Sequence, residues 1–157
     1  MSYSTVLSLD DAKAYLRVSH TDSDDEITRM IKSALEIVEI KTNQLLYQRA
    51  TKTYTLYGGC VRIYDGPINT SGVTGLATTV TRTDYRNYSL FEDSNEDNTS
   101  VILDVGYTSA SSVPRGLLDA ALEMIDYWYY KNDGKVSIML MPESVEQVLG
   151  MHTRFLI

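Results

Sequence analysis

The sequence has few of the residues on which catalysis in small proteins most often depends. Its 157 residues include one cysteine and two histidines. The single cysteine, Cys60, excludes an intramolecular disulfide and a cysteine-rich zinc site, because both need more than one thiol. His20 and His152 lie in different segments, and neither stands beside a Ser or Cys nucleophile motif. No catalytic triad can be assembled from these residues, so we expect a protein that is not an enzyme.

Long apolar runs are missing as well. No segment approaches the roughly 20 consecutive apolar residues that cross a bilayer, and residues 1–5 have neither the basic nor the apolar region of a secretory signal. We therefore expect no membrane association and synthesis in the cytoplasm of the host cell. A chain of this length is expected to fold as a single domain.

Basic residues are outnumbered by acidic ones. The chain has 14 Lys and Arg against 21 Asp and Glu, which gives a formal net charge of −7 and a pI near 4.7. Proteins that grip nucleic acid do so through clustered Lys and Arg on the phosphates. The composition therefore argues against tight DNA binding, and any contact with DNA should be loose.

Two short segments have incomplete ligand-binding patterns. Residues 93–97 alternate oxygen-bearing side chains as a calcium loop does, but Asn98 replaces the turn glycine and Asp104 replaces the bidentate glutamate. Gly58-Gly59 lacks the lysine of a phosphate-binding loop. We interpret these segments as a solvated loop and a turn, and we expect no metal and no cofactor.

Helical periodicity is strong in the first part of the chain. A short helix is predicted from Ser8 to about Arg17. The capping-box pattern of Ser23 and Glu26 predicts the start of a long helix that runs to about Leu46. This helix is expected to be the longest element of the fold.

The last part of the chain is helical too. Pro114 takes an early position in a second amphipathic helix, which is predicted to end near residues 132–134. Pro142 opens a last short helix, which Gly150 is expected to end. These helices should pack on the long helix.

Between the two helical parts the apolar period changes to two. Strands are predicted at residues 51–57, 61–64, 76–83 and 101–107. Residues 84–100 mix Tyr, Asn, Asp and Glu without a period, which indicates a long exposed loop or the tip of an extended hairpin. The aromatic side chains in this stretch, Tyr85, Tyr88 and Phe91, are candidate contacts to a partner.

Together these elements predict an α+β, mainly helical fold. We expect a small helical bundle around one long helix, with an antiparallel β-hairpin or arm inserted. Within one domain, residues 1–157, the helical core takes residues 8–47 and 113–150. The β region and loop take residues 51–107, and a C-terminal tail takes residues 151–157.

Four aromatic residues follow one another in the second amphipathic helix, from Tyr127 to Tyr130. Four successive helical residues span about 300° of the circumference, so they cannot all face one core. Trp128 and Tyr129 are expected to face inward. Tyr127 and Tyr130 should lie on a flank, either as partly exposed tyrosines or at a subunit interface, where Tyr and Trp are enriched.

Several short sequence motifs, taken in order, resemble those of the head-to-tail connector (adaptor) family of tailed bacteriophages. The motifs are residues 7–18 (LSLDDAKAYLRV), 22–27 (DSDDEI), 105–107 (VGY), 113–114 (VP), 127–130 (YWYY) and 141–145 (MPESV). The resemblance covers nearly the whole chain and depends on the order of the motifs rather than on any one of them.

The resemblance implies a structural protein of the virion neck. Subunits of this family assemble as a homo-oligomeric ring, commonly dodecameric, beneath the portal protein. The ring extends the DNA channel, through which DNA passes without specific binding, and provides the docking surface for a head-closure or tail-completion protein. A monomeric binding or regulatory module of prophage origin is the alternative from a different class.

The C-terminal tail is the candidate contact to the portal. Its residues are Met151, Arg154, Phe155, Leu156 and Ile157, with His152 and Thr153 between them. An apolar end of this kind could fold back on its own core or insert into a groove of a neighbour. The family resemblance favours docking on the portal.

Overall fold

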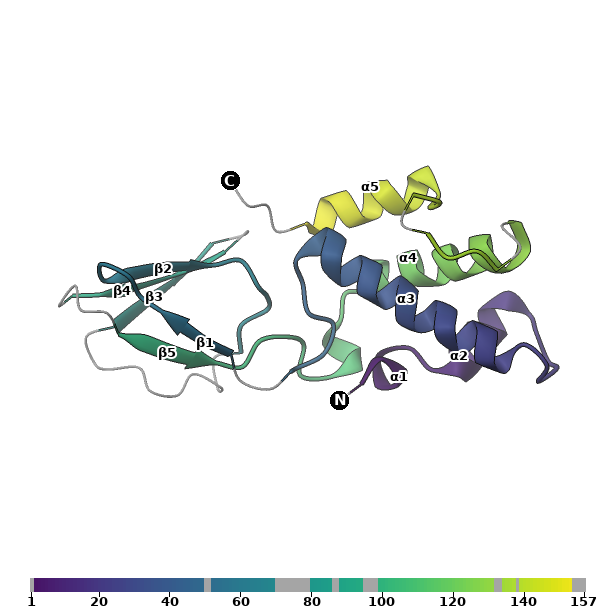
Figure 1. Ribbon diagram of the computed structural model, residues 1–157, viewed down its shortest axis with the longest axis horizontal. Helices are drawn as coiled ribbons and strands as arrows, with labels where there is room; N and C mark the ends of the chain where they lie inside the picture. The colour runs from purple at the N-terminus through teal and green to yellow at the C-terminus, as the bar shows by residue number, and fades with distance from the viewer. Residues whose placement is uncertain are drawn as a thin grey trace.

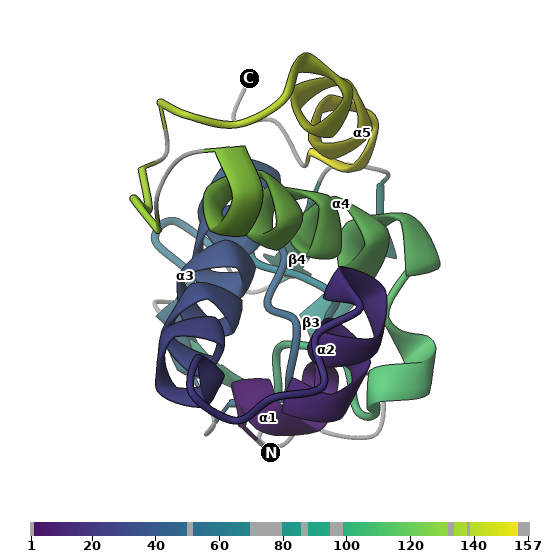
Figure 2. The same cartoon turned by 90° about the vertical axis from the view of Figure 1, so that its right-hand side faces the viewer.

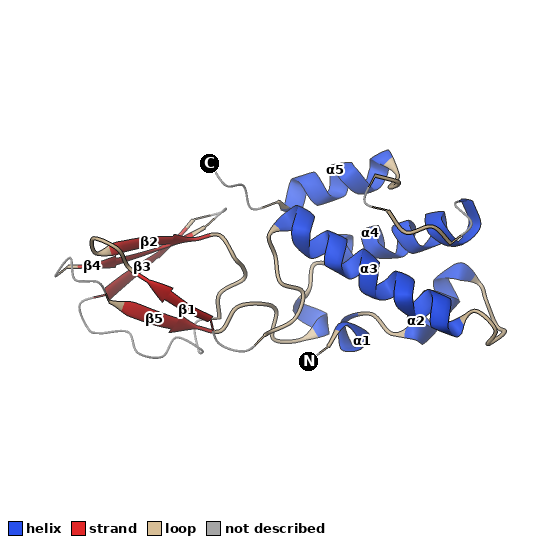
Figure 3. Cartoon of the chain, viewed as in Figure 1, coloured by secondary structure: helices blue, strands red, loops and turns tan. Residues whose placement is uncertain are grey.

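A computed structural model of the chain describes residues 2–49, 52–69, 80–85, 88–94, 99–131, 134–137 and 139–153. The molecule is elongated, with helices at one end and strands at the other (Figure 1). Figure 3 shows that the two kinds of element are almost fully separated. Both ends of the sequence contribute helices, and the middle of the sequence contributes the strands.

The helical region contains five α-helices in the described part of the chain. They are α1 (Tyr3–Val6), α2 (Leu9–Leu16), α3 (Asp24–Thr42), α4 (Arg115–Asp126) and α5 (Glu143–His152). α3 packs against the other four, and α2 and α5 also pack against α4. Their apolar faces share one core, in which Trp128 is the largest fully buried side chain.

Local signals set some helix ends and not others. Ser8 caps α2 as predicted, since its Oγ accepts a hydrogen bond from the Asp11 N–H at 3.1 Å. The predicted capping box at Ser23 is wrong, because this side chain makes no cap hydrogen bond. α3 ends at Thr42, before the predicted end, because Asn43 turns the chain with a left-handed φ of 53°.

The β region contains two small antiparallel sheets in the described part of the chain. One pairs β1 (Lys52–Thr55) with β5 (Ser100–Leu103). The other has the order β2-β4-β3, formed by Cys60–Ile63, Ser89–Asp93 and Val80–Asp84. The two sheets share an apolar cluster of their own, made of Leu56, Ile63, Ile68, Phe91, Val101, Leu103 and Val105.

The expected fold class, a small and mainly helical bundle around one long helix with a hairpin arm, is therefore wrong. A hairpin arm would leave its apolar residues exposed, whereas Leu56, Phe91 and Val101 have no exposed surface. The physical reason is long-range pairing. β1 pairs with β5 from the far end of the region, and this pairing closes a second core that periodicity alone does not reveal.

Residues 84–100 are not one long loop, because they contain β4, the central strand of the three-stranded sheet. The buried side chains of β4 alternate along the strand, but two of them, Ser89 and Asp93, are polar. The Asp93 carboxylate accepts a hydrogen bond from the Thr99 hydroxyl at 2.6 Å, which offsets the cost of its burial. These polar residues hide the period of two in the sequence.

Backbone hydrogen bonds join the helical and β regions. After α3, the Leu45 N–H donates to the Gly66 carbonyl at 2.7 Å, and the Gln48 N–H donates to the Tyr107 carbonyl at 2.8 Å. The Tyr107 N–H donates back to the Leu45 carbonyl at 3.1 Å. The segment that leaves α3, residues 45–49, therefore runs beside the segment that returns toward α4, residues 105–107. We call this pair of segments the junction.

Gly106 is required by the junction. Its φ is +111°, and a Cβ atom there would stand 2.3 Å from the Tyr47 carbonyl oxygen. We expect Gly106→Ala to lower the free energy of unfolding by about 3 kcal/mol or more, because backbone strain and a backbone clash add. Gly58→Ala is the matched control, since Gly58 also has a positive φ but open space around it.

The control should cost about 1–2 kcal/mol, the ordinary penalty of a left-handed residue with a Cβ. Urea unfolding of the two variants measures both losses. Equal losses would show that the close approach at Tyr47 adds nothing to the stability of the junction.

Candidate functional site

A polar cluster fixes the junction to α1 and α3. Glu39 is a buried charged residue at the end of α3, and its carboxylate accepts hydrogen bonds from the Leu46 N–H at 2.8 Å and the Tyr3 hydroxyl at 2.6 Å. It also forms a hydrogen-bonded ion pair with the Arg49 guanidinium. Arg49 lies over the ring of Tyr47, 4.9 Å from its centroid. Leu46, Tyr47 and Arg49 belong to the segment that leaves α3, so the cluster ties this segment to Glu39 of α3 and to Tyr3 of α1.

The electrostatics of this cluster favour a neutral Tyr3 and a charged Arg49. Burial raises the pKa of Tyr3 above its ordinary value of 10.0, and the hydrogen bond to Glu39 raises it further. Burial alone would lower the pKa of Arg49, but Glu39, Tyr3 and Tyr47 together more than offset this and the pKa is raised. The protonated Tyr3 therefore stabilises the fold below pH 10, and this contribution is lost as the pH rises further.

The predicted aromatic run forms a short π-helix, residues Tyr127–Lys131, after α4. Trp128 is fully buried, and its Nε1–H donates to the Leu140 carbonyl at 3.0 Å. Tyr129 is half-buried and its hydroxyl donates to Ser23 Oγ at 3.2 Å. The inward orientation of Trp128 is therefore confirmed, and Ser23 bonds Tyr129 rather than its own helix.

Tyr127 and Tyr130, the two predicted interface residues, lie in different surroundings. Tyr127 is half-buried and packs against the helical core. The Tyr130 side chain is 56% exposed, although its hydroxyl donates a hydrogen bond to the Leu16 carbonyl at 2.6 Å. The ring of Tyr130 is therefore accessible to a partner while its hydroxyl holds the end of α2.

The predicted contact residues of the β region divide into two groups. Tyr85 is 47% exposed and stacks on Tyr88, with 4.7 Å between the ring centroids. Tyr88 is half-buried and also contacts the Tyr64 ring and the Arg62 guanidinium. Phe91 has no exposed surface and belongs to the β core, so its side chain cannot reach a partner.

The C-terminal tail is described only at its start. Met151 lies in the last turn of α5 with 72% of its surface exposed. Thr153 follows the helix, and its hydroxyl contacts the Leu149 carbonyl at 2.8 Å and the Lys41 carbonyl at 3.1 Å. The other predicted portal contacts, Arg154 to Ile157, lie outside the described residues.

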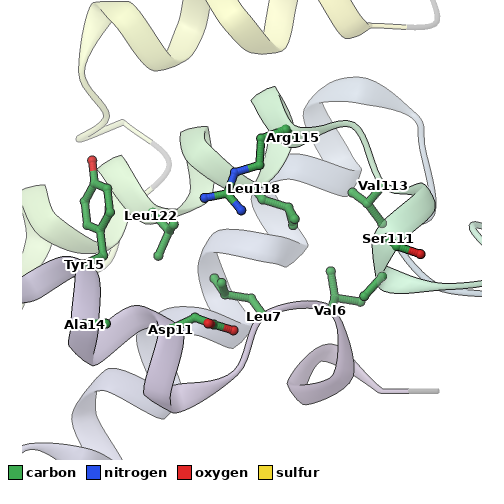
Figure 4. A pocket seen from close by; sticks show the side chains of 11 residues that line it. Val6, Leu7, Asp11, Ala14, Tyr15, Ser111, Val113, Arg115, Leu118 and Leu122 are labelled. Carbon is green, nitrogen blue, oxygen red and sulfur yellow. The ribbon is translucent and has the colours of Figure 1, made fainter.

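An apolar groove lies between α1 and α2 on one side and the start of α4 on the other (Figure 4). It has a volume of about 520 Å³. Val6, Leu7, Ala14, Tyr15, Leu118 and Leu122 line it. Asp11, Ser111 and Arg115 supply polar groups to the same groove.

The sequence contains one signal for this groove. Leu117 and Leu118 are both apolar, and adjacent helix positions are separated by about 100°, so Leu118 widens the apolar face of α4 beyond Leu117. Leu117 is fully buried, whereas Leu118 is only partly buried and lines the groove. An apolar arc wider than one packing face therefore indicates a second contact surface on α4.

Neither a metal site nor a membrane span is found in the described part of the chain. No group of three or more His, Cys, Asp or Glu side chains comes together there to hold a metal ion. None of the helices among these residues has the length and apolar character needed to cross a bilayer. His20 is exposed before α3, and His152 ends α5. Residues 95–98 of the calcium-like pattern lie outside the described residues.

The polar cluster at Glu39 should be a main source of stability at the junction. We expect Glu39→Gln to lower the free energy of unfolding by about 2 kcal/mol, because an amide NH₂ would face Tyr3 and Arg49 and leave the cation without its partner. This loss of unfolding free energy is smaller than the loss expected for a fully buried ion pair, because the Arg49 side chain is 38% exposed. Urea unfolding at pH 7 measures the change.

Glu36→Gln is the matched control, one helical turn away. Its carboxylate lies 3.9 Å from the Lys32 ammonium in an exposed pair, which contributes about 0.5 kcal/mol or less. If the two variants lose the same stability, the cluster has no special role.

Comparison with known proteins gives structural relatives only. No protein-family model matches the sequence, and no curated protein is similar to it in sequence. A chain from the neck of an empty gene transfer agent (GTA) particle, computed with C6 symmetry, superposes with a TM-score of 0.72 at 17% identity, over 98% of this chain and 92% of that chain.

Two further solved structures agree with this result. A chain of the native GTA virion has a TM-score of 0.70 at 16% identity, over 98% of this chain and 92% of its own length. A chain from the native GTA neck, computed with C12 symmetry, has a TM-score of 0.65 at 15% identity, over 98% and 91%. The chain therefore has the fold of a chain of the GTA neck. This result confirms, at the level of the fold, the resemblance to neck proteins that the sequence motifs indicate.

Proposed function

We propose that the chain is a structural, non-enzymatic subunit of a virion neck, a head-to-tail connector that joins a ring beneath the portal protein. The observation that carries the proposal is the fold shared with the GTA neck chain, over 98% of this chain and 92% of that one. Both the helical region and the β region belong to that shared architecture. The order of the sequence motifs supports the same role independently of the fold.

A ring agrees with the symmetry of the similar structures, which are necks computed with C6 and C12 symmetry. In a ring each subunit presents two different faces to its neighbours. We propose Tyr127 and Tyr130 as subunit contacts, since the exposed ring of Tyr130 is of a type enriched at interfaces. Tyr85 and Tyr88 would contact a neighbouring subunit or an adjacent ring.

The acidic composition suits a DNA channel. A net charge of −7 repels phosphates, so that DNA can slide through the ring without specific binding. The far side of the ring would dock a head-closure or tail-completion protein. The subunit would be made in the host cytoplasm and incorporated into the neck during assembly.

Light scattering separates this function from that of a monomeric prophage-derived module. We expect the free chain to be a monomer or a weak oligomer at micromolar concentration, and to form a ring when portal rings are added, because the portal sets the symmetry. A chain that stays monomeric beside its portal would contradict the proposal. A stable ring without portal would contradict the templated assembly.

The tail gives a sharper test of portal docking. We propose that Met151, Arg154, Phe155, Leu156 and Ile157 contact the portal. Deletion of residues 154–157 should leave the melting temperature nearly unchanged, because it keeps all of α5 and the hydrogen bonds of Thr153. Co-sedimentation with portal should be lost, since each buried apolar side chain contributes roughly 1.5–3 kcal/mol.

Ile40→Ser is the control, because it removes an apolar side chain that is 67% exposed on α3 and should leave portal binding intact. A truncated chain that melts several degrees lower and still binds portal would show that the tail packs on its own core instead.

A further inference from the structure

A small pocket lies between the end of α3 and α5. Its volume is about 230 Å³, and Met141 and the buried Leu149 supply much of its apolar surface. Figure 2 shows α5 on the opposite side of α4 from α1 and α2, so this pocket is separate from the groove between α2 and α4. The other lining residues are Lys41, Glu146, Gly150 and Thr153.

Gly150 keeps this pocket open. The sequence predicted that Gly150 ends α5, and this prediction is wrong, because the helix continues to His152. Glycine within a helix is less favourable than alanine, and a Cβ atom at Gly150 would meet no described atom within 4 Å. Packing among the described residues therefore does not require a glycine here. Its effect is to leave room for another side chain.

The pocket has the size and chemistry to receive an aromatic ring. A cavity of roughly 150 Å³ is enough to hold benzene, so a volume of about 230 Å³ accepts a phenyl ring. Met141 favours an aromatic occupant, because the thioether of methionine makes favourable contacts with aromatic rings. The methylene groups of Lys41 add apolar surface while its ammonium stays in water.

The chain leaves α5 at the edge of the same pocket. Thr153 is the last described residue, and its backbone is extended, with φ −66° and ψ 132°. Its hydroxyl contacts the Lys41 carbonyl at 3.1 Å and the Leu149 carbonyl at 2.8 Å, and both of these residues line the pocket. Phe155 follows two positions later. Because an extended residue spans roughly 3.3–3.6 Å, Phe155 is the first large apolar residue of the tail within reach of the pocket.

We propose that, in the free subunit, the ring of Phe155 occupies this pocket of its own chain and leaves it when the tail contacts the portal. We call this contact the latch. The inference rests on the proposed portal contact of the tail and adds its regulation. The latch lowers the affinity of the free subunit for the portal, because only the fraction of molecules with an open latch presents Phe155.

The latch is weak compared with the fold. Gly150 is exposed, so the ring stays partly in contact with water, and closing the latch costs the entropy of ordering the tail. A contact of this kind opens locally, well before the core unfolds. Deletion of residues 154–157 should therefore still leave the melting temperature nearly unchanged.

Fluorine NMR tests the latch without any partner. The chain contains two phenylalanines, Phe91 and Phe155, so labelling the full chain with 4-fluorophenylalanine gives two resonances. Phe91 is fully buried and serves as the internal reference, and Phe155→Leu assigns the other signal. The Phe155 resonance should lie away from its position in urea and should respond only weakly to exchange of H₂O for D₂O. A resonance at the unfolded position with a full solvent response would overturn the proposal.

Filling the pocket gives the matched pair of variants. Gly150→Leu should move the Phe155 resonance to its unfolded position, while the Phe91 resonance and the fluorescence of the buried Trp128 stay unchanged because the fold is intact. Gln147→Leu is the control, since Gln147 is exposed on α5 and does not line the pocket. The latch is wrong if Gly150→Leu leaves the Phe155 resonance in place, or if both variants move it equally.

Portal binding separates this inference from the function on which it rests. Gly150→Leu keeps the tail free, so it should bind portal roughly threefold or more tightly than the wild-type chain in co-sedimentation. Weaker or equal binding would overturn the release of the latch on the portal, and weaker binding would indicate that the pocket receives a portal side chain instead. If the wild-type chain and the variant both fail to bind portal, the proposed function fails, whereas the fluorine spectra still decide whether the latch exists.

Discussion

The junction between the helical and β regions is the constraint on which the rest of the structure depends. Each region has its own apolar core, so packing alone would leave them free to move against each other. The paired segments after α3 and before α4 remove that freedom, and Glu39 fixes them to α3 through one buried carboxylate. Gly106 permits the close approach of the two segments. A subunit that must keep its shape in an assembly needs a connection of this kind.

Rigidity of this kind suits a part that transmits position rather than chemistry. The aromatic run serves the same end in the helical region, because Trp128, Tyr129 and Tyr130 each hydrogen-bond a different segment. Trp128 also holds the loop that presents Met139 and Leu140. The exposed ring of Tyr130, which is proposed for subunit contact, is therefore held in place by its hydrogen bond to the end of α2.

The sequence predicted the helices well, because α2, α3, α4 and α5 each have an apolar stripe of period 3.6 and most begin at a recognisable residue. It did not predict the second core. β4 buries Ser89 and Asp93 and so lacks the apolar alternation of a half-buried strand, and the pairing of β1 with β5 spans the whole region. Tyr130 was predicted to lie on a flank, and its exposed ring agrees; Phe91 was predicted to contact a partner, but β4 turns it inward. The position of the groove could not be predicted from the sequence, because the groove combines α1, α2 and α4 from both ends of the chain.

Imaging the neck by electron cryomicroscopy, with this chain bound to its portal, tests the central claim most directly. The account predicts a closed ring of copies against the portal, with the helical and β regions of each copy keeping the relative placement set by the junction. Density for isolated copies, or the absence of the chain from the complex, would contradict it.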